Sequence, residues 1–259
     1  MAIDIHFDAV DSLPIDSATV MVVRDGTQGL EVLMMRRHGD SGVLGGAHVF
    51  PGGKLDVEDT QRTPEGEWHE AAWYAKALAE PGRAPEVARG LFVAALRETS
   101  EECGLLLDPQ TLWPWSRWIT PRQPSVSRKR FDTRFFVAPA PEGQDAVHDA
   151  FEATETVWVR PAAALERYWD GEIDLAPPQI MSLAQLVRLK DVALVMAAAR
   201  AHPPVLIEPH PFDEAGERVI CYPGDPLHPV QSRAWDGPTR LRYRNRRFEP
   251  EGGLAALLG

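Results

Sequence analysis

Three glutamates stand close together near the middle of the chain, in the run RETSEECGL that covers residues 97–105. At about 100° per residue, the side chains of Glu98, Glu101 and Glu102 would fall within an arc of about 100° on one helix face. Carboxylates at this spacing repel each other, and the negative end of the helix dipole adds to the cost. A hard divalent cation such as Mg²⁺ would turn that cost into affinity. The run therefore predicts a metal-binding helix end.

The helix that positions these acids is predicted to begin at Pro85, a residue type that suits the first helical turn. Its apolar stripe sits beside the acidic face on the same helical wheel and consists of Phe92, Ala95, Leu96, Thr99 and Cys103. Gly104 can adopt the left-handed conformation that ends a helix. The acids are thus expected at the edge of a hydrophobic core.

Composition limits the classes of partner. The chain has 259 residues, of which 44% are hydrophobic, and a net charge of −11. Binding to a nucleic-acid backbone needs a basic surface, so a nucleic-acid partner is not expected. Two cysteines imply no disulfide framework, and no apolar window has the length of a signal peptide or a membrane span. We expect a cytoplasmic protein without membrane segments, and a homodimer is compatible with the sequence.

Hydrophobic periodicity predicts alternating strands and helices, which indicates an α/β or α+β sandwich. Residues 17–23 and 30–36 are expected to pair as antiparallel strands through the turn at 24–29. The tryptophan-rich segment 113–118 is expected to be a packed loop or an interface. Further predicted helices cover residues 67–80, 161–169 and 178–202, and further predicted strands cover residues 131–138, 155–159, 205–207, 219–222 and 239–246.

The last predicted strand is rich in arginine. Its basic side chains are Arg240, Arg242, Arg244, Arg246 and Arg247. They could form a solvated edge that prevents aggregation, or they could contact phosphate. We expect one domain over residues 1–259, with a core at about 15–200, a helical insertion at about 60–90 and a β-rich extension at about 203–259.

The acidic run resembles the second half of the Nudix box, G-x5-E-x7-R-E-U-x-E-E-x-G-U, where U is aliphatic or similar. The first half is present at Gly53–Asp59, with aspartate where glutamate is usual. Residues 60–96, 37 in number, replace the usual seven between the two halves. This arrangement is similar to a branch of Nudix hydrolases whose box is split by a helical insertion and which includes a coenzyme A diphosphatase. The similarity extends to residues 46–53, 118–121 and 130–136.

The resemblance implies an α/β/α sandwich with a mixed β-sheet, Mg²⁺ or Mn²⁺ as cofactor, and hydrolysis of a diphosphate linkage in a nucleoside diphosphate derivative. It implies that Glu98, Glu101 and Glu102 are metal ligands, together with the backbone carbonyl of Gly52. Arg97 would orient Glu101 through a charge-assisted hydrogen bond. Whether Asp59 takes part is left open.

The resemblance leaves two further sets of residues as candidates. The general base could be Glu98 of the box, or Glu152 or Glu155 before a later strand. Substrate contacts are predicted for Arg36, His48, Gly53 and Arg134, although a lone histidine is often structural.

The substrate is a small molecule that the sequence does not single out. Coenzyme A or an acyl derivative comes first by resemblance, and ADP-ribose, NADH or another dinucleotide remains open. A non-catalytic, nucleotide-binding regulatory module is the alternative to an enzyme. The insertion at residues 60–90 is expected to form a wall of the substrate pocket.

Overall fold

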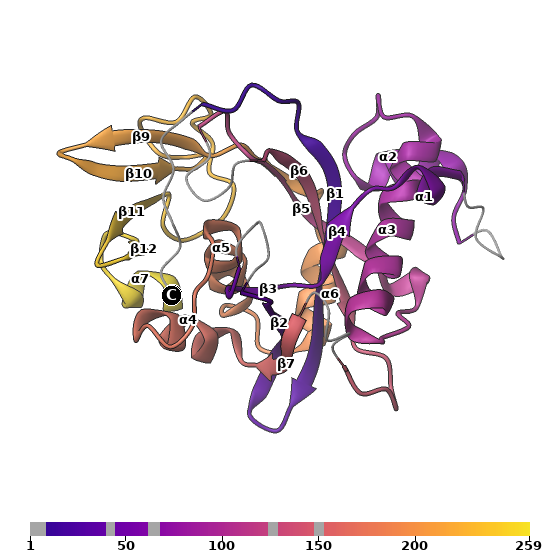
Figure 1. Ribbon diagram of the computed structural model, residues 1–259. Helices are drawn as coiled ribbons and strands as arrows, with labels where there is room; N and C mark the ends of the chain where they lie inside the picture. Colours follow the sequence, from indigo (N-terminus) through magenta and orange to yellow (C-terminus); the bar gives the residue numbers. More distant parts are fainter. Residues whose placement is uncertain (1–8, 40–44, 62–67, 124–128, 148–152) are drawn as a thin grey trace.

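The computed structural model describes residues 9–39, 45–61, 68–123, 129–147 and 153–259 (Figure 1). Its centre is an eight-stranded mixed sheet with the strand order β3-β2-β1-β6-β5-β8; β4 pairs with β1, and β7 pairs with β2. β1 runs parallel to β6 and β5 runs parallel to β8, whereas the other pairs are antiparallel. The strands are β1 (Ile15–Gly26), β2 (Gly29–Arg37), β3 (His48–Val49), β4 (Gly52–Lys54), β5 (Trp113–Ile119), β6 (Phe131–Pro139), β7 (Ala153–Val159) and β8 (Val205–Ile207).

Helices cover both faces of this sheet, and each face has its own hydrophobic core (Figure 1). Alternation along β1 sends Val20 and Val22 to the core beneath α3 (Pro85–Cys103). Met21 and Val23 point to the opposite core, which holds α4 (Pro161–Trp169), α5 (Pro177–Leu186) and α6 (Val192–Ala201). Such alternation is the period of two that a buried strand imposes. The predicted α/β/α sandwich with a mixed sheet is confirmed.

The helix that carries the acidic run forms as predicted. It begins at Pro85, in the first turn, and ends at Cys103, and Gly104 caps it with φ at 68°. The predicted pair of strands at residues 17–23 and 30–36 is also confirmed, in the antiparallel register of β1 and β2. α4 has the predicted bounds.

The insertion packs against α3. α1 (Val57–Gln61) leads from the first half of the box into the insertion, and the insertion contains α2 (Ala71–Ala77), which is shorter than the predicted helix at residues 67–80. α1 approaches α3 at Gly90, where an added side chain would press against Leu55 and Thr60. Tyr74 and Trp73 of α2 pack on Phe92 of α3. The insertion is thus fixed to the acidic helix along much of its length.

Three predicted elements are wrong, the third of them in the C-terminal extension. The tryptophan-rich segment is the strand β5, not a packed loop, and its pairing with β6 is irregular between Pro114 and Ser116. Residues 178–202 form two helices, because the second one starts anew at Asp191, whose carboxylate accepts a hydrogen bond from the Leu194 amide at 2.8 Å. An apolar stripe continues across the break and hides it from the sequence.

The extension adds one strand to the main sheet and then builds a second sheet. β8 joins the edge of the main sheet, while the four strands of the second sheet have the order β12-β11-β10-β9. The predicted strand at 239–246 divides at a turn, because Asn245 and Arg246 both have left-handed backbones. The elements of the extension are β9 (His210–Glu214), β10 (Glu217–Cys221), β11 (Arg240–Arg244), β12 (Arg247–Glu249) and α7 (Leu254–Leu258).

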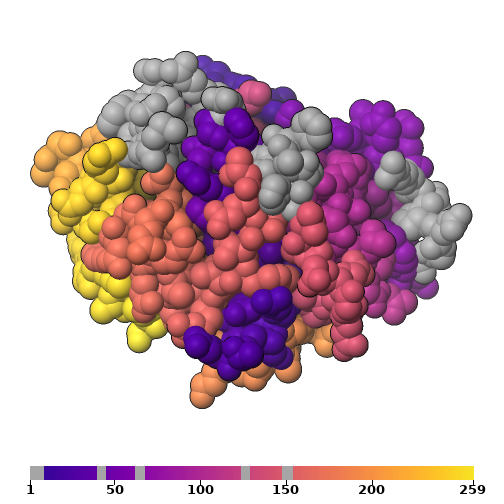
Figure 2. Space-filling view, turned by 60° about the horizontal axis from the view of Figure 1, so that its bottom comes forward, coloured from indigo at the N-terminus to yellow at the C-terminus, as the bar shows by residue number. Residues whose placement is uncertain are grey.

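The second sheet is attached to α4 by hydrogen bonds to Tyr168. The Phe248 amide donates to the Tyr168 hydroxyl at 2.7 Å, and that hydroxyl donates to the Phe248 carbonyl at 3.1 Å. Figure 2 shows the yellow C-terminal segment directly against the salmon segment that contains α4. Within the described residues, no helix is long and apolar enough to cross a membrane. The short 3-10 helix Pro109–Thr111 completes the regular elements.

Candidate active site

The C-terminal end of α3 lies against the backbone of β4. The amide of Gly52 donates a hydrogen bond to Glu102 Oε2 at 2.7 Å, and Glu102 is only 3% exposed. The carboxylate of Glu98 lies over Gly53 so closely that a β-carbon there would overlap it. Gly52 faces the backbone of Ala18 and Thr19 with the same lack of space. Both glycines are therefore needed for the close approach of β4 to the acidic helix.

Arg97 joins the two halves of the split box. Its Nε donates to Asp59 Oδ1 at 2.9 Å and its Nη2 donates to Asp59 Oδ2 at 2.8 Å, a forked pair with a carboxylate that is 0% exposed. The hydrogen bonds to Asp59 and the nearby charge of Glu98 raise the pKa of the Arg97 guanidinium. Asp59 thus anchors the arginine of the box, a role that the sequence left open.

The same guanidinium reaches the acids of the helix. Arg97 Nη1 donates to Glu98 Oε1 at 2.8 Å and to Glu101 Oε2 at 3.0 Å, and Nη2 donates to the carbonyl of Lys54 at 3.1 Å. The predicted contact between Arg97 and Glu101 is present. Whether it orients Glu101 during a reaction stays a prediction.

The donors at this helix end suit a hard divalent cation in type. Three carboxylates come from two successive turns of one helix, and Glu98 and Glu102 both lie against the Gly52–Gly53 backbone, whose carbonyls are further oxygen donors. Among the residues that the structure describes, no three acidic, histidine or cysteine side chains already form a metal cage. Arg97 and the Gly52 amide occupy the carboxylate oxygens instead. Glu101, with its side chain 60% exposed, is the acid with most freedom to turn.

A second group of predicted residues meets at a separate cleft. Arg36 of β2 pairs across the sheet with His48 of β3 on one side and with Glu155 of β7 on the other. These three residues line a cleft of about 610 Å³, together with the C-terminal end of α4, the loop that follows it and the turn between β11 and β12. Of the described residues of the insertion, none lines this cleft, so the expected pocket wall at residues 60–90 is not found there.

His48 is a deeply buried polar residue of the cleft. It is 4% exposed, and among the described residues neither ring nitrogen has a hydrogen-bond partner. Its amide donates to the carbonyl of Asp174 at 2.9 Å, which fixes the backbone but leaves the ring unpaired. Desolvation by burial lowers the pKa of His48, with Arg167 and Arg36 acting in the same direction against Glu155. The ring is thus favoured in its neutral form.

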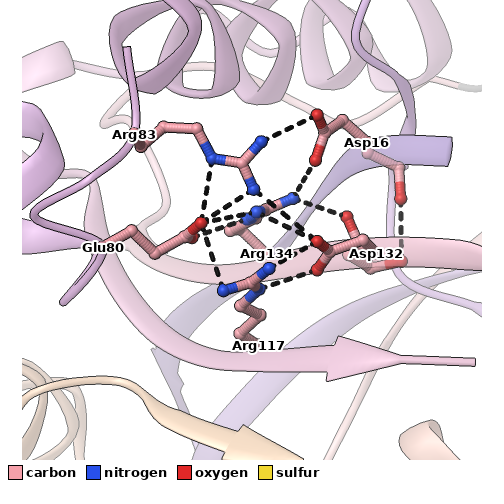
Figure 3. A network of polar contacts seen from close by, with 8 residues as sticks. Asp16, Glu80, Arg83, Arg117, Asp132 and Arg134 are labelled. Atoms are coloured by element: carbon pink, nitrogen blue, oxygen red, sulfur yellow. Dashed lines mark hydrogen bonds and ion pairs between the residues drawn. The ribbon is translucent and has the colours of Figure 1, made fainter. Parts of the chain in front are cut away.

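Arg134 lies in neither group, and its predicted contact with substrate is not supported. It is 1% exposed and donates to Glu80 from Nε at 2.9 Å and from Nη2 at 2.7 Å (Figure 3). Its Nη1 donates to Asp16 and to the carbonyl of Asp132. Figure 3 shows Arg83 and Arg117 around the same acids. Since Glu80 and Arg83 belong to the insertion, this cluster attaches the insertion to the sheet.

The remaining predicted residues are Glu152 and the arginines of the C-terminal extension. Glu152 lies outside the described residues. Four of the C-terminal arginines pair with acids: Arg240 with Asp225, Arg242 with Glu214, Arg244 with Glu217 and Arg247 with Glu249. Arg246 and Arg247 line the cleft. Their positive charge was the only signal in the sequence that pointed to this placement.

Comparison with known proteins gives evidence from a part of the chain that lies outside the box. Residues 108–186 match the family model of the NUDT19 Nudix domain. The acyl-coenzyme A diphosphatases NUDT19 of Xenopus laevis and Homo sapiens are 24% and 25% identical, over 63% and 64% of this chain. The alignments span 61% and 63% of those two proteins.

A solved structure gives the same assignment. The crystal structure of a NUDIX hydrolase from Alicyclobacillus acidocaldarius matches with a TM-score of 0.58 and 26% identity, over 73% of this chain and 97% of the other. The chain therefore belongs to the Nudix superfamily, and its sequence relatives include the acyl-coenzyme A diphosphatases.

Proposed function

We propose that this protein uses a divalent cation, Mg²⁺ or Mn²⁺, to hydrolyse a diphosphate linkage in a nucleoside diphosphate derivative. Coenzyme A or an acyl-coenzyme A is the first substrate to test. The single observation that carries the proposal is the joined box: Arg97 binds Asp59 of the first half and contacts Glu98 and Glu101 of the second.

Each residue of the box would have its own role in holding the cation. Glu98, Glu101 and Glu102, with the carbonyl of Gly52, would hold the cation. When bound, the cation would neutralise the diphosphate and polarise its phosphorus–oxygen bonds. Arg97 would hold Glu98 and Glu101 in place, because a guanidinium pinned by a buried aspartate loses little further freedom when it donates to other carboxylates.

Hydrolysis adds water across one P–O–P bridge and yields two phosphate monoesters, so a base must accept a proton from the water. Glu98 and Glu155 are the two candidate bases that lie within the residues that the structure describes. Glu98 lies within the box, whereas Glu155 lines the cleft beside Arg36. Turnover by Glu98→Gln and Glu155→Gln over a range of pH would distinguish them, since only loss of the base removes the ascending limb of the pH profile.

Support for a coenzyme A substrate comes from the named relatives, which are acyl-coenzyme A diphosphatases. ADP-ribose and NADH contain the same diphosphate linkage and remain the alternative substrates. Cytoplasmic location and a homodimer stay predictions from the sequence.

The test is a panel of diphosphates assayed with and without Mg²⁺: acetyl-coenzyme A, coenzyme A, ADP-ribose and NADH. The proposal expects Mg²⁺-dependent release of two monoesters, with the coenzyme A compounds at the highest kcat/KM. Binding of these compounds without turnover of any of them, in the presence of either cation, would contradict the proposal and favour a regulatory nucleotide-binding module.

A further inference from the structure

One wall of the cleft is formed by the C-terminal extension. The turn between β11 and β12 places Asn245, Arg246 and Arg247 at the cleft. Arg247 fixes this turn to the end of α4, because its Nη1 donates to the Trp169 carbonyl at 2.8 Å and its guanidinium lies 4.3 Å from the Trp169 ring centroid. These contacts hold the turn in place at the wall of the cleft.

Arg246 has no hydrogen-bond or ion-pair partner among the residues that the structure describes. Its backbone is left-handed, with φ at 64°, and its side chain is exposed. Within the described part of the chain, Arg246 makes no ion pair, and the same holds for Arg36 and Arg37 across the cleft. Three guanidinium groups therefore line one opening, in a cleft that five arginines and the three acids Glu155, Glu172 and Asp174 line together.

The floor of the same cleft holds polar atoms that are hidden from water and that no described residue pairs with. Both ring nitrogens of His48 are in this condition, and so is Nε of Arg37. A buried polar group without a partner costs about 1–3 kcal/mol, so such groups usually have a function or an absent partner. Their position in a cleft rimmed by cations indicates an anionic ligand with further polar groups that reach the floor.

The cleft and the box are close along the chain but do not coincide. His48 stands four residues before Gly52, so even an extended chain separates their α-carbons by at most about 14 Å. The cleft is lined by none of the three box glutamates. One ligand of nucleotide size could therefore place its diphosphate at the box and another charged group in the cleft.

We propose that Arg246 of the C-terminal extension, together with Arg36, binds a phosphate monoester of the substrate that is separate from the diphosphate being cleaved. The extension is then a substrate-recognition element. This inference rests on the proposed function for the identity of the ligand as a nucleotide. A guanidinium suits the role because it can donate two parallel hydrogen bonds to a phosphate.

The test measures binding by calorimetry in EDTA, so that no turnover occurs. The probes are adenosine 3′,5′-bisphosphate, which carries the extra monoester, and adenosine 5′-monophosphate, which lacks it. The variant is Arg246→Asn, because asparagine tolerates the left-handed backbone. The matched control is Arg244→Asn, on the same hairpin, whose arginine pairs with Glu217 and does not line the cleft.

Wild type and the Arg244→Asn control should bind the bisphosphate roughly tenfold more tightly than the monophosphate, the value of one charge-assisted contact. Arg246→Asn should lose that preference. Equal affinity of wild type for both probes would overturn the inference, as would a preference that survives in Arg246→Asn. Inorganic phosphate that binds as tightly as the bisphosphate would overturn the assignment to substrate. Because no turnover is measured, failure here is separate from failure of the hydrolysis panel.

Discussion

Arg97 and Asp59 stand 38 positions apart and form a forked ion pair, with Nε–Oδ1 at 2.9 Å and Nη2–Oδ2 at 2.8 Å. This pair joins the residue before the insertion to the residue after it, and so it brings the two halves of the box together. Asp59 Oδ2 also accepts the amide of Asp56 at 2.9 Å, so the carboxylate is held from both sides. The pair allows a long insertion to interrupt the box without separating its parts.

Removal of the charge of Asp59 should lower the free energy of unfolding and should also lower the activity of the box. Asp59→Asn leaves Arg97 without its buried partner, and we expect a loss of about 2 kcal/mol of unfolding free energy, below the usual range for buried pairs because Arg97 is partly exposed. Urea unfolding measures this loss. The control is Asp56→Asn, whose exposed carboxylate lies 3.4 Å from Arg97 and should contribute about 0.5 kcal/mol or less. Equal effects of the two variants would contradict the role given to Asp59.

A side chain at Gly53 should disturb the acids without unfolding the protein. Gly53→Ala places a β-carbon where the Glu98 carboxylate lies, and we expect kcat to fall by about 100-fold through misplacement of that acid. Gly82→Ala is the control, since an added β-carbon at Gly82 meets no atom within 4 Å. Steady-state kinetics and thermal unfolding of both variants check the prediction. Full activity of Gly53→Ala would show that the position of Glu98 does not matter.

Arg134 should matter for stability and not for substrate binding. Arg134→Met leaves Glu80, Asp16 and Asp132 without their central cation, and we expect a loss of about 3 kcal/mol of unfolding free energy. The KM of the folded fraction should not change. Arg122→Met, at an exposed pair with Asp11, provides the control and should have almost no effect. A raised KM at unchanged stability would restore the sequence-based expectation of a substrate contact.

The pH dependence of stability should report the buried ring of His48. Its pKa in the folded protein lies below the ordinary value of 6.5, so the unfolded chain binds more protons than the folded chain as the pH falls below about 6.5. The stabilisation by the neutral ring is therefore complete above that value. It is lost as the pH falls from about 6.5 toward the lowered folded pKa.

Urea unfolding at pH 8 and at pH 5.5, for wild type and for His48→Gln, measures this effect. Wild type should lose more free energy of unfolding between the two pH values than the variant, which cannot titrate at this position. Identical losses would mean that His48 has the same pKa in both states. Saturation with adenosine 3′,5′-bisphosphate should reduce the difference between the loss of unfolding free energy in wild type and the loss in His48→Gln.

Local patterns predicted the acidic helix well because its signals lie within a few residues of each other. Pro85 starts α3, Gly104 ends it, and the apolar stripe between them is buried. β5 was missed because Trp113 and Trp115 lie on the half-exposed face while Pro114 and Ser116 are buried, which reverses the usual alternation. The break before Asp191 was missed because apolar residues flank it on both sides.

Contacts between distant residues could not be predicted. The role of Arg134 depends on Glu80 and Asp16, which are 54 and 118 positions away. The cleft depends on a turn about 200 residues after His48, built by left-handed backbones that a single sequence does not reveal. The box could be recognised because the identities of its residues survive the insertion. The pairing of Arg97 with Asp59 required the fold.

The most direct test of the central claim is the rate of diphosphate cleavage by Glu102→Gln at saturating Mg²⁺, with coenzyme A as substrate. Glutamine keeps an oxygen that can accept the Gly52 amide but lacks the charge that a cation needs, so the fold should persist while kcat falls by about 100-fold or more. Glu58→Gln, an exposed acid of α1, should retain the wild-type rate. Wild-type turnover by Glu102→Gln, with the same dependence on Mg²⁺, would contradict the account.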